Sequence, residues 1–309
     1  SGGTTFSGTV AATTVTLSNT TGSIVFNDAL TATTLNTAAQ GYNVELNGST
    51  GTITNAVTFS NTGALALGAS GGTLTFNGGL TATAPSASTL KGTITSSNDA
   101  MSFGPITLGA NTTLNTVATT NVADLSIGAV TGATYNLTLR TGAVSGAEIT
   151  GTSTSGVGTL TITNSGGTTF SGTVAATTVT LTNTTGSIIF NDALTATTLN
   201  TAAQGYNVEL NGASGTITNA VTFSNTGALA LGASGGTLTF NGGLTATAPS
   251  ASTLKGTIAS SDDAMSFGPI TLGANTTLNT VATTNVADLS IGAVTGATYN
   301  LTLRTGAVS

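Results

Sequence analysis

The most informative features of this sequence are the residues that it lacks. Among its 309 residues there is no cysteine, no histidine and no tryptophan, and lysine and arginine together number only four. The missing histidines remove the usual imidazole base and metal ligand, and the missing cysteines remove thiolate nucleophiles and zinc–thiolate sites. Four cations are too few to neutralise a nucleic-acid backbone. These absences argue against much of catalytic chemistry and against a nucleic-acid partner.

Charge is scarce, whereas small polar residues are abundant. Charged residues make up 5% of the chain, against about 25% in an ordinary soluble domain, and ten acidic residues leave a net charge of −6. Hydrophobic residues still amount to 39%, so the composition is not that of a disordered segment. The 42 glycines and the abundant threonine and asparagine favour short strands joined by turns. Because no apolar run approaches about 18 residues, we expect an all-β protein without membrane insertion.

Internal repetition organises the chain. Residues 1–145 recur as residues 165–309, an offset of 164, with six differences between similar side chains. The differing pairs are Ser18/Thr182, Val25/Ile189, Ser49/Ala213, Thr50/Ser214, Thr95/Ala259 and Asn98/Asp262. The stretch 146–164 has no counterpart in the second copy. We therefore expect a first repeat unit over 1–164 and a second, incomplete unit over 165–309.

A finer period of 20 or 21 residues runs through each unit. Apolar residues recur at this spacing in two columns, of which the first is Phe6, Phe26, Leu46 and Leu67 and the second is Ile53, Leu74, Ile94 and Leu114. Apolar and polar residues alternate around these positions, and clusters of asparagine and glycine separate the runs. The pattern predicts short strands that each bury one face.

This short period favours a parallel β-helix, or β-solenoid, with coils of about 20 residues. Each coil would place its strands on the equivalent strands of the preceding coil, about 4.8 Å away. Like charges stacked at that spacing would repel each other, which accounts for the charge-poor composition. Tandem β-sandwich domains of about 160 residues are the alternative, but sandwich strands need not repeat at a constant spacing. We expect the two units to form one continuous solenoid.

The two ends of the sequence consist of ordinary repeat sequence, whereas solenoids are usually closed by atypical terminal repeats. An uncapped coil exposes unpaired strand edges and apolar core residues. We therefore expect the chain to associate with itself, head to tail along the solenoid axis.

Several segments resemble the β-helical repeats of filamentous-haemagglutinin-like bacterial exoproteins, among them 14–19 (TVTLSN), 23–28 (SIVFND) and 72–77 (GTLTFN). The resemblance in coil length and composition covers nearly the whole chain, although the sequence does not include the N-terminal secretion domain of that family. It implies a secreted protein, extracellular or on the cell surface, with an adhesive or scaffolding role. Host-cell or surface glycans are the partners that such a role implies.

Threonine pairs flanking a single residue recur near the coil spacing and form the candidate site. They are Thr31, Thr33, Thr52, Thr54, Thr73, Thr75, Thr93 and Thr95. If the residue between each pair points inward, both threonines point outward, and successive coils stack them into two columns. Such columns resemble the ice-binding face of β-solenoid antifreeze proteins. An ordinary ladder of β-branched residues is the other interpretation, and the replacement of Thr95 by Ala259 interrupts the array in the second copy.

The charged residues offer little for catalysis, and we expect the protein not to be an enzyme. Asp28 and Glu45, 17 residues apart, are a carboxylate pair that adjacent coils would bring near each other. Lys91 and Arg140 are the only cations of a copy and stand 49 residues apart. We expect no cofactor and no metal, and the turns at Asn27–Asp28 and Asn98–Asp99 are the best calcium candidates.

A carbohydrate-binding surface would need exposed aromatic residues, for which Tyr42 and Tyr135 are the candidates in the first copy. The sequence as a whole favours a non-enzymatic structural repeat segment of a secreted bacterial surface protein. Such a segment would form a rigid rod or an end-to-end filament in adhesion or cell-surface scaffolding. An ice-binding β-solenoid is the alternative function.

Overall fold

The computed structural model describes residues 2–18, 20–142, 144–296 and 298–306. Asn19 of the segment 14–19 and the last three residues of the unit 165–309 lie outside these ranges. The described residues contain strands and turns but no helix. The chain divides into two compact units, Ser1–Gly166 and Gly167–Ser309. The division falls two residues after the repeat boundary at 164/165.

The strands of the first unit form three parallel ladders. The first ladder consists of β1 (Thr4–Phe6), β3 (Ser23–Phe26), β5 (Asn43–Leu46), β8 (Leu65–Leu67), the first halves of β11 (Ser88–Ser96) and β13 (Ile106–Ala118), β15 (Val130–Thr131) and the start of β18 (Thr154–Ile162). The second consists of the first halves of β2 (Val10–Leu17) and β4 (Leu30–Thr37), β6 (Thr50–Ile53), β9 (Thr73–Phe76), the second halves of β11 and β13, β16 (Leu137–Gly142) and the end of β18. The third consists of the second halves of β2 and β4, β7 (Val57–Thr58), β10 (Leu80–Ala82), β12 (Met101–Phe103), β14 (Leu125–Ile127) and β17 (Glu148–Gly151).

The second unit has the same three ladders. Its first ladder consists of β19 (Gly167–Phe170), β21 (Ser187–Phe190), β23 (Asn207–Leu210), β26 (Leu229–Leu231), the first halves of β29 (Ser252–Ser260) and β31 (Ile270–Asn279), and β33 (Val294–Thr295). Its second consists of the first halves of β20 (Val174–Leu181) and β22 (Leu194–Thr201), β24 (Ser214–Ile217), β27 (Thr237–Phe240), the second halves of β29 and β31, and β34 (Leu301–Arg304). Its third consists of the second halves of β20 and β22, β25 (Val221–Thr222), β28 (Leu244–Ala246), β30 (Met265–Phe267) and β32 (Leu289–Ile291).

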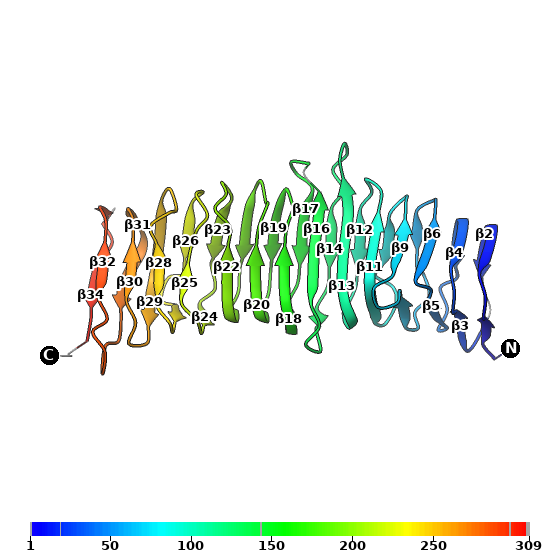
Figure 1. Cartoon of the computed structure of the whole chain (residues 1–309), viewed down its shortest axis with the longest axis horizontal. Helices are drawn as coiled ribbons and strands as arrows, with labels where there is room; N and C mark the ends of the chain where they lie inside the picture. Colours follow the sequence, from blue (N-terminus) through cyan, green and yellow to red (C-terminus); the bar gives the residue numbers. More distant parts are fainter. Residues whose placement is uncertain (1, 19, 143, 297, 307–309) are drawn as a thin grey trace. The chain divides into compact units, whose positions relative to one another are not determined.

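This arrangement is a β-solenoid. Equivalent strands lie about 21 residues apart, their pairing is parallel, and the turns number about 14 in all. Figure 1 shows the strands of the second ladder of the first unit, from β4 to β16, side by side and pointing the same way. The expectation of a parallel β-helix is thus confirmed, and the alternative of tandem sandwiches is wrong, because sandwiches are built from antiparallel strands.

The core of each unit is made of apolar side chains stacked on successive turns. In β11 the residues alternate between buried and partly exposed along the whole strand. The first apolar column of the sequence is confirmed, since Phe6 pairs with Phe26, Phe26 with Leu46, and Leu46 with Leu67. Alternation along each strand and stacking between turns therefore act together to fill the interior.

The second apolar column is correct only in part. Leu74 pairs with Ile94, and Ile94 with Leu114, but Ile53 lies opposite Phe76 instead of Leu74. The reason is a longer turn between β8 and β9, which shifts the register of β9 by two residues.

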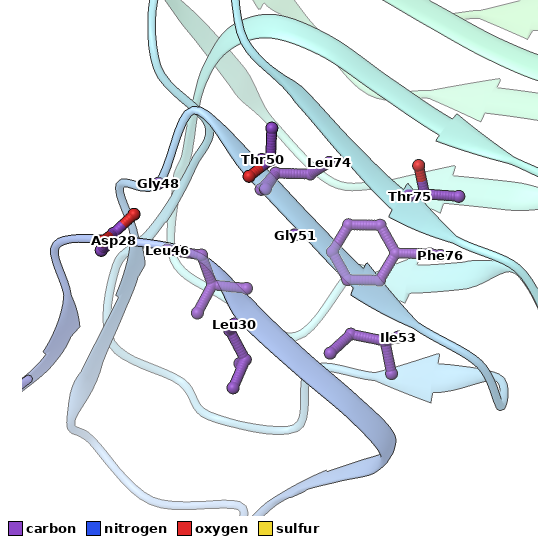
Figure 2. Close-up of a pocket in the computed structure, with 10 residues that line it drawn as sticks. All are labelled: Asp28, Leu30, Leu46, Gly48, Thr50, Gly51, Ile53, Leu74, Thr75 and Phe76. Carbon is purple, nitrogen blue, oxygen red and sulfur yellow. The ribbon is translucent and has the colours of Figure 1, made fainter. Parts of the chain in front are cut away.

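The shift places Leu74 opposite Gly51. A Cβ atom on Gly51 would lie 3.0 Å from Leu74 Cδ2, so the leucine occupies the space that the glycine leaves open. Figure 2 shows Leu74 near Gly51, with Phe76 and then Ile53 lower in the view. The recess that remains here has a volume of about 10 Å³, which is room for about one water molecule.

Candidate functional site

The outward side chains of the second ladder form a regular polar surface in the first unit, which we call the threonine face. Its first column contains Thr50, Thr73, Thr93, Thr113, Thr138 and Thr161. Its second column contains Thr31, Thr52, Thr75, Thr95, Asn115 and Arg140. Successive residues of a column are spaced by one strand separation, about 4.8 Å.

The structure places all eight threonines of the candidate site on the outer side, and none of them is buried. The residues between the pairs point inward and are at most 4% exposed: Ala32, Ile53, Leu74 and Ile94. The register differs from the expected one, however, because Thr52 lies opposite Thr75 and not Thr73. The physical reason is the two-residue shift of β9.

The shift also changes which threonines belong together. Thr73 lies opposite Thr50, which was not among the predicted threonines, and Thr33 and Thr54 lie outside the two columns. Thr113, Thr138 and Thr161, which continue the first column, were not predicted either. The sequence pattern that could have identified them is a threonine followed by an apolar residue and then by another polar residue, as in 113–115 and 161–163.

The hydroxyl groups of the first column are available to solvent or to a ligand. Within the described residues, no hydrogen bond involves the hydroxyls of these six threonines. In the second column, Thr95 Oγ1 donates to the carbonyl oxygen of Asn115 at 2.9 Å. Since each free hydroxyl is both donor and acceptor, the face can order water or bind hydroxylated molecules.

The second unit carries a shorter version of this face. The first column there is Ser214, Thr237, Thr257, Thr277 and Thr302, and the second is Thr195, Thr216, Thr239, Ala259, Asn279 and Arg304. Ala259 removes one hydroxyl from the second column. A polar hollow of about 440 Å³ adjoins the first column and is also lined by Asn275 and Asn300.

The two carboxylates considered as a pair each make a local hydrogen bond. Asp28 lies in the turn after β3 and accepts a hydrogen bond at Oδ1 from the backbone N–H of Ala29, at 2.8 Å. Glu45 lies in β5, and its Oε2 accepts one from Asn47 Nδ2 at 3.3 Å. Within the described ranges, no group of three or more carboxylates is positioned to hold a metal ion.

The second calcium candidate, at Asn98, holds a loop of the next turn. Asn98 has φ 66°, a left-handed conformation that asparagine and aspartate tolerate. Its Oδ1 accepts hydrogen bonds from the backbone N–H groups of Thr119 and Thr120, and its Nδ2 donates to Thr119 Oγ1 at 2.9 Å. The side chain therefore fixes the loop that follows β13.

Asp262 takes the place of Asn98 in the second unit and makes the equivalent contacts. Its carboxylate accepts hydrogen bonds from the backbone N–H of Thr283 and from the N–H and hydroxyl of Thr284. The Thr284 hydroxyl and these backbone N–H groups hold the pKa of Asp262 well below its usual range. The two copies thus differ in charge at an otherwise equivalent loop anchor.

The two tyrosine candidates for carbohydrate binding have different surroundings. Tyr42 is fully buried, and its hydroxyl donates to the Leu17 carbonyl at 2.9 Å and accepts from Ala38 N–H at 2.8 Å. Burial raises the pKa of Tyr42. Tyr42 is therefore part of the core, and its proposed role at a surface is wrong, whereas Tyr135 is 39% exposed.

Comparison with known proteins identifies no family for this chain. No family model, curated protein or solved structure matches this chain. The observed solenoid is compatible with a β-helical repeat protein. Among the described residues, no helix is long and apolar enough to cross a membrane.

Proposed function

We propose that the chain is a non-enzymatic structural segment of a secreted bacterial surface protein, which serves as a scaffold by associating with itself head to tail. The fold supports a structural role because stacked backbone ladders and apolar columns stiffen each unit. The filamentous-haemagglutinin-like character of the repeats supports the extracellular location. The observation that carries the self-association is the way one turn covers the next in the first unit, where the end of β18 pairs with β16.

The edge of β34 is the counterpart of an edge that is covered in the first unit. β16 has the same sequence as β34 at Leu137–Arg140, and the end of β18 pairs with it, placing Ile162 opposite Leu139. Leu139 is consequently 0% exposed. β34 repeats the sequence of β16 and can therefore receive a strand of the same alternating pattern.

The first turn of a second copy matches this edge. Residues 14–17 (TVTL) have the same alternation as residues 159–162 (TLTI), the segment that covers β16. Pairing of β2 with β34 in that register places Leu17 of the second copy opposite Leu303. Such a contact repeats along a line and does not close, so it generates a filament.

Sedimentation velocity and electron microscopy of the purified chain test this proposal. We expect elongated assemblies that grow with concentration, and we expect Leu303→Lys to abolish them because it places a charge on the apolar edge. Thr81→Lys, which adds the same charge to the outer side of the third ladder, is the matched control and should assemble normally. A synthetic peptide of residues 146–164 should block assembly by covering β34. A chain that stays monomeric at high micromolar concentration would refute the proposal.

The free hydroxyls of the threonine face favour ice binding as a second candidate function. Thr50, Thr73 and Thr93 stand beside Thr52, Thr75 and Thr95 in three successive rows, which gives a regular hydroxyl lattice. Thermal hysteresis of the wild type, compared with a Thr75→Tyr variant, tests this function. Ice binding requires hysteresis that Thr75→Tyr abolishes and that Thr81→Tyr, on the third ladder, leaves intact.

A further inference from the structure

A surface groove next to the threonine face contains the only arginine of each copy. In the first unit the groove has a volume of about 360 Å³, and its lining includes Asn115, Val117, Thr119, Arg140, Gly142 and Val144. In the second unit a groove of about 420 Å³ is lined by the counterparts Asn279, Val281, Thr283, Arg304 and Gly306. Grooves of this size accommodate small ligands. Each copy therefore places its arginine in a groove, although in the second copy the Thr283 hydroxyl donates to the carboxylate of Asp262.

The guanidinium group of Arg140 has no partner among the described residues. No hydrogen bond or ion pair of that group occurs there, and its Nε is buried without a hydrogen-bond acceptor. The chain has ten carboxylates for four cations, so the unpaired state does not come from a shortage of anions. Buried donors usually find an acceptor, because burying one without a partner costs its hydration. Arg140 is half-buried and lines the groove, so the part of its guanidinium that faces the groove is available to an external acceptor.

The wall of the groove is held in a strained conformation in both copies. Val117 has φ 49° and Val281 has φ 50°, a left-handed conformation that is rare for a β-branched residue. Asn115 Oδ1 stabilises it by accepting the Val117 N–H at 3.0 Å, and Asn279 does the same for Val281. The result is an exposed apolar side chain beside the arginine, with Val117 38% exposed. Strain that is retained in this way is typical of binding sites.

We propose that this groove binds the carboxylate of an acidic saccharide, such as a uronic acid. The guanidinium of Arg140 would take both carboxylate oxygens in a bidentate pair, the geometry for which arginine is suited. Val117 would pack against the C–H face of the sugar ring. Thr119 Oγ1 already accepts a hydrogen bond from Asn98 Nδ2, so its own hydrogen remains available for a sugar oxygen. A groove with one cation, in a chain of net charge −6, suits a singly charged group and disfavours a polyanion.

Isothermal titration calorimetry with galacturonic acid, which carries a single carboxylate, tests the proposal, with its methyl ester as the neutral probe. We expect saturable binding of the acid at the groove of the first unit, weaker binding at the second, where the Thr283 hydroxyl is held by Asp262, and no binding of the ester. Arg140→Gln should remove one site, and Arg140→Gln combined with Arg304→Gln should weaken binding at least tenfold. The matched control, Lys91→Gln with Lys255→Gln, makes the same charge change outside the groove and should bind as the wild type does.

The variants are expected to fold, because the guanidinium of Arg140 makes no hydrogen bond that they would remove. Arg140→Lys provides a second check, since it keeps the charge and loses the planar pair of donors, and it should weaken the first site severalfold. Three results would each overturn the proposal. They are equal affinity for the acid and the ester, an equal loss of affinity in the lysine control, and wild-type affinity in Arg140→Lys. The groove of the first unit does not involve β34, so its binding is measurable whether or not the chain assembles head to tail.

Discussion

The register shift at β9 makes a quantitative prediction about Gly51 and Leu74. Leu74→Ala removes three buried carbon atoms, worth about 0.8 kcal/mol each, and the added cavity raises the loss of stability to about 3 kcal/mol. Gly51→Ala alone places a Cβ atom 3.0 Å from both Leu74 Cδ2 and the Leu30 carbonyl oxygen. We expect it to destabilise the turn by about 1 kcal/mol through overpacking.

The double variant tests the register itself. Once Leu74 is truncated, the new methyl group at residue 51 no longer meets the leucine side chain and fills part of the vacated space, while its contact with the Leu30 carbonyl oxygen remains. We therefore expect the combined loss to be smaller than the sum of the single losses by about 1 kcal/mol. A uniform 21-residue spacing would place Leu74 opposite Ile53, and residues 51 and 74 would then be independent. Additivity within about 0.5 kcal/mol would refute the structural reasoning.

Hydrogen–deuterium exchange followed by mass spectrometry is the suitable assay, because it measures local opening of a repeat protein. Peptides that span residues 49–50 are distinguishable by mass from those of the second copy, where alanine and serine occupy 213–214. The second copy also supplies a replicate: Gly215 faces Leu238, and a Cβ atom there would lie 3.1 Å from Leu238 Cδ2. The same coupling should appear between these two residues.

Three further predictions concern single side chains. Tyr42→Phe should cost about 1 kcal/mol in urea unfolding, because the Leu17 carbonyl loses one of its two donors and keeps only the Ala38 N–H; no change would show that this hydrogen bond is dispensable. Because the pKa of Asp262 is lowered in the folded protein, its carboxylate stabilises the loop fully at a pH above the unfolded pKa of about 3.9, and this stabilisation is lost as the pH falls through the folded pKa. Hydrogen exchange of the loop amides should therefore become faster in acid. The loop held by the neutral Asn98 should show no such pH dependence, and Asp262→Asn should abolish the difference between the two loops. Gly92→Ala should lower the free energy of unfolding by more than about 2 kcal/mol, because residue 92 has φ 69° and the new Cβ would collide with the Ala69 carbonyl oxygen. Gly71→Ala is the control, since residue 71 has φ 73° but lies in open space, and it should cost only about 1 kcal/mol in thermal melts.

The sequence predicted the solenoid because two independent periodicities agree. Alternation along each run specifies a half-buried strand, and recurrence every 20 or 21 residues specifies what each strand stacks on. At Phe6, Phe26 and Leu46 the two rules give the observed pairs. At Ile53 the constant spacing predicted the wrong partner, because the longer turn before β9 shifts its register and Gly51 leaves room for Leu74. The number of residues between two apolar positions does not show which side chains fit each other in volume.

The candidate surface was harder to predict than the fold, because outward positions are not constrained by packing. The outward placement of Thr31 and Thr52 followed from alternation, but the partner of each threonine depended on the register of β9. Tyr42 illustrates the opposite error: a tyrosine in a polar sequence suggested exposure, yet two backbone groups satisfy its hydroxyl inside the core. The groove at Arg140 had no signal at all, since it depends on the loop conformation of Val117.

The comparison of Asn98 with Asp262 shows how the scarcity of charge follows from the stacking. Both side chains accept backbone N–H groups of the next turn, so the anchor works with either residue. An ionised anchor adds pH dependence, while a neutral amide fixes the same loop by donating to its hydroxyls. In a structure whose neighbouring turns are about 4.8 Å apart, neutral anchors can be repeated on every turn without mutual repulsion. We infer that asparagine and threonine replace ionised residues in this chain because they make the same contacts without accumulating charge along a column.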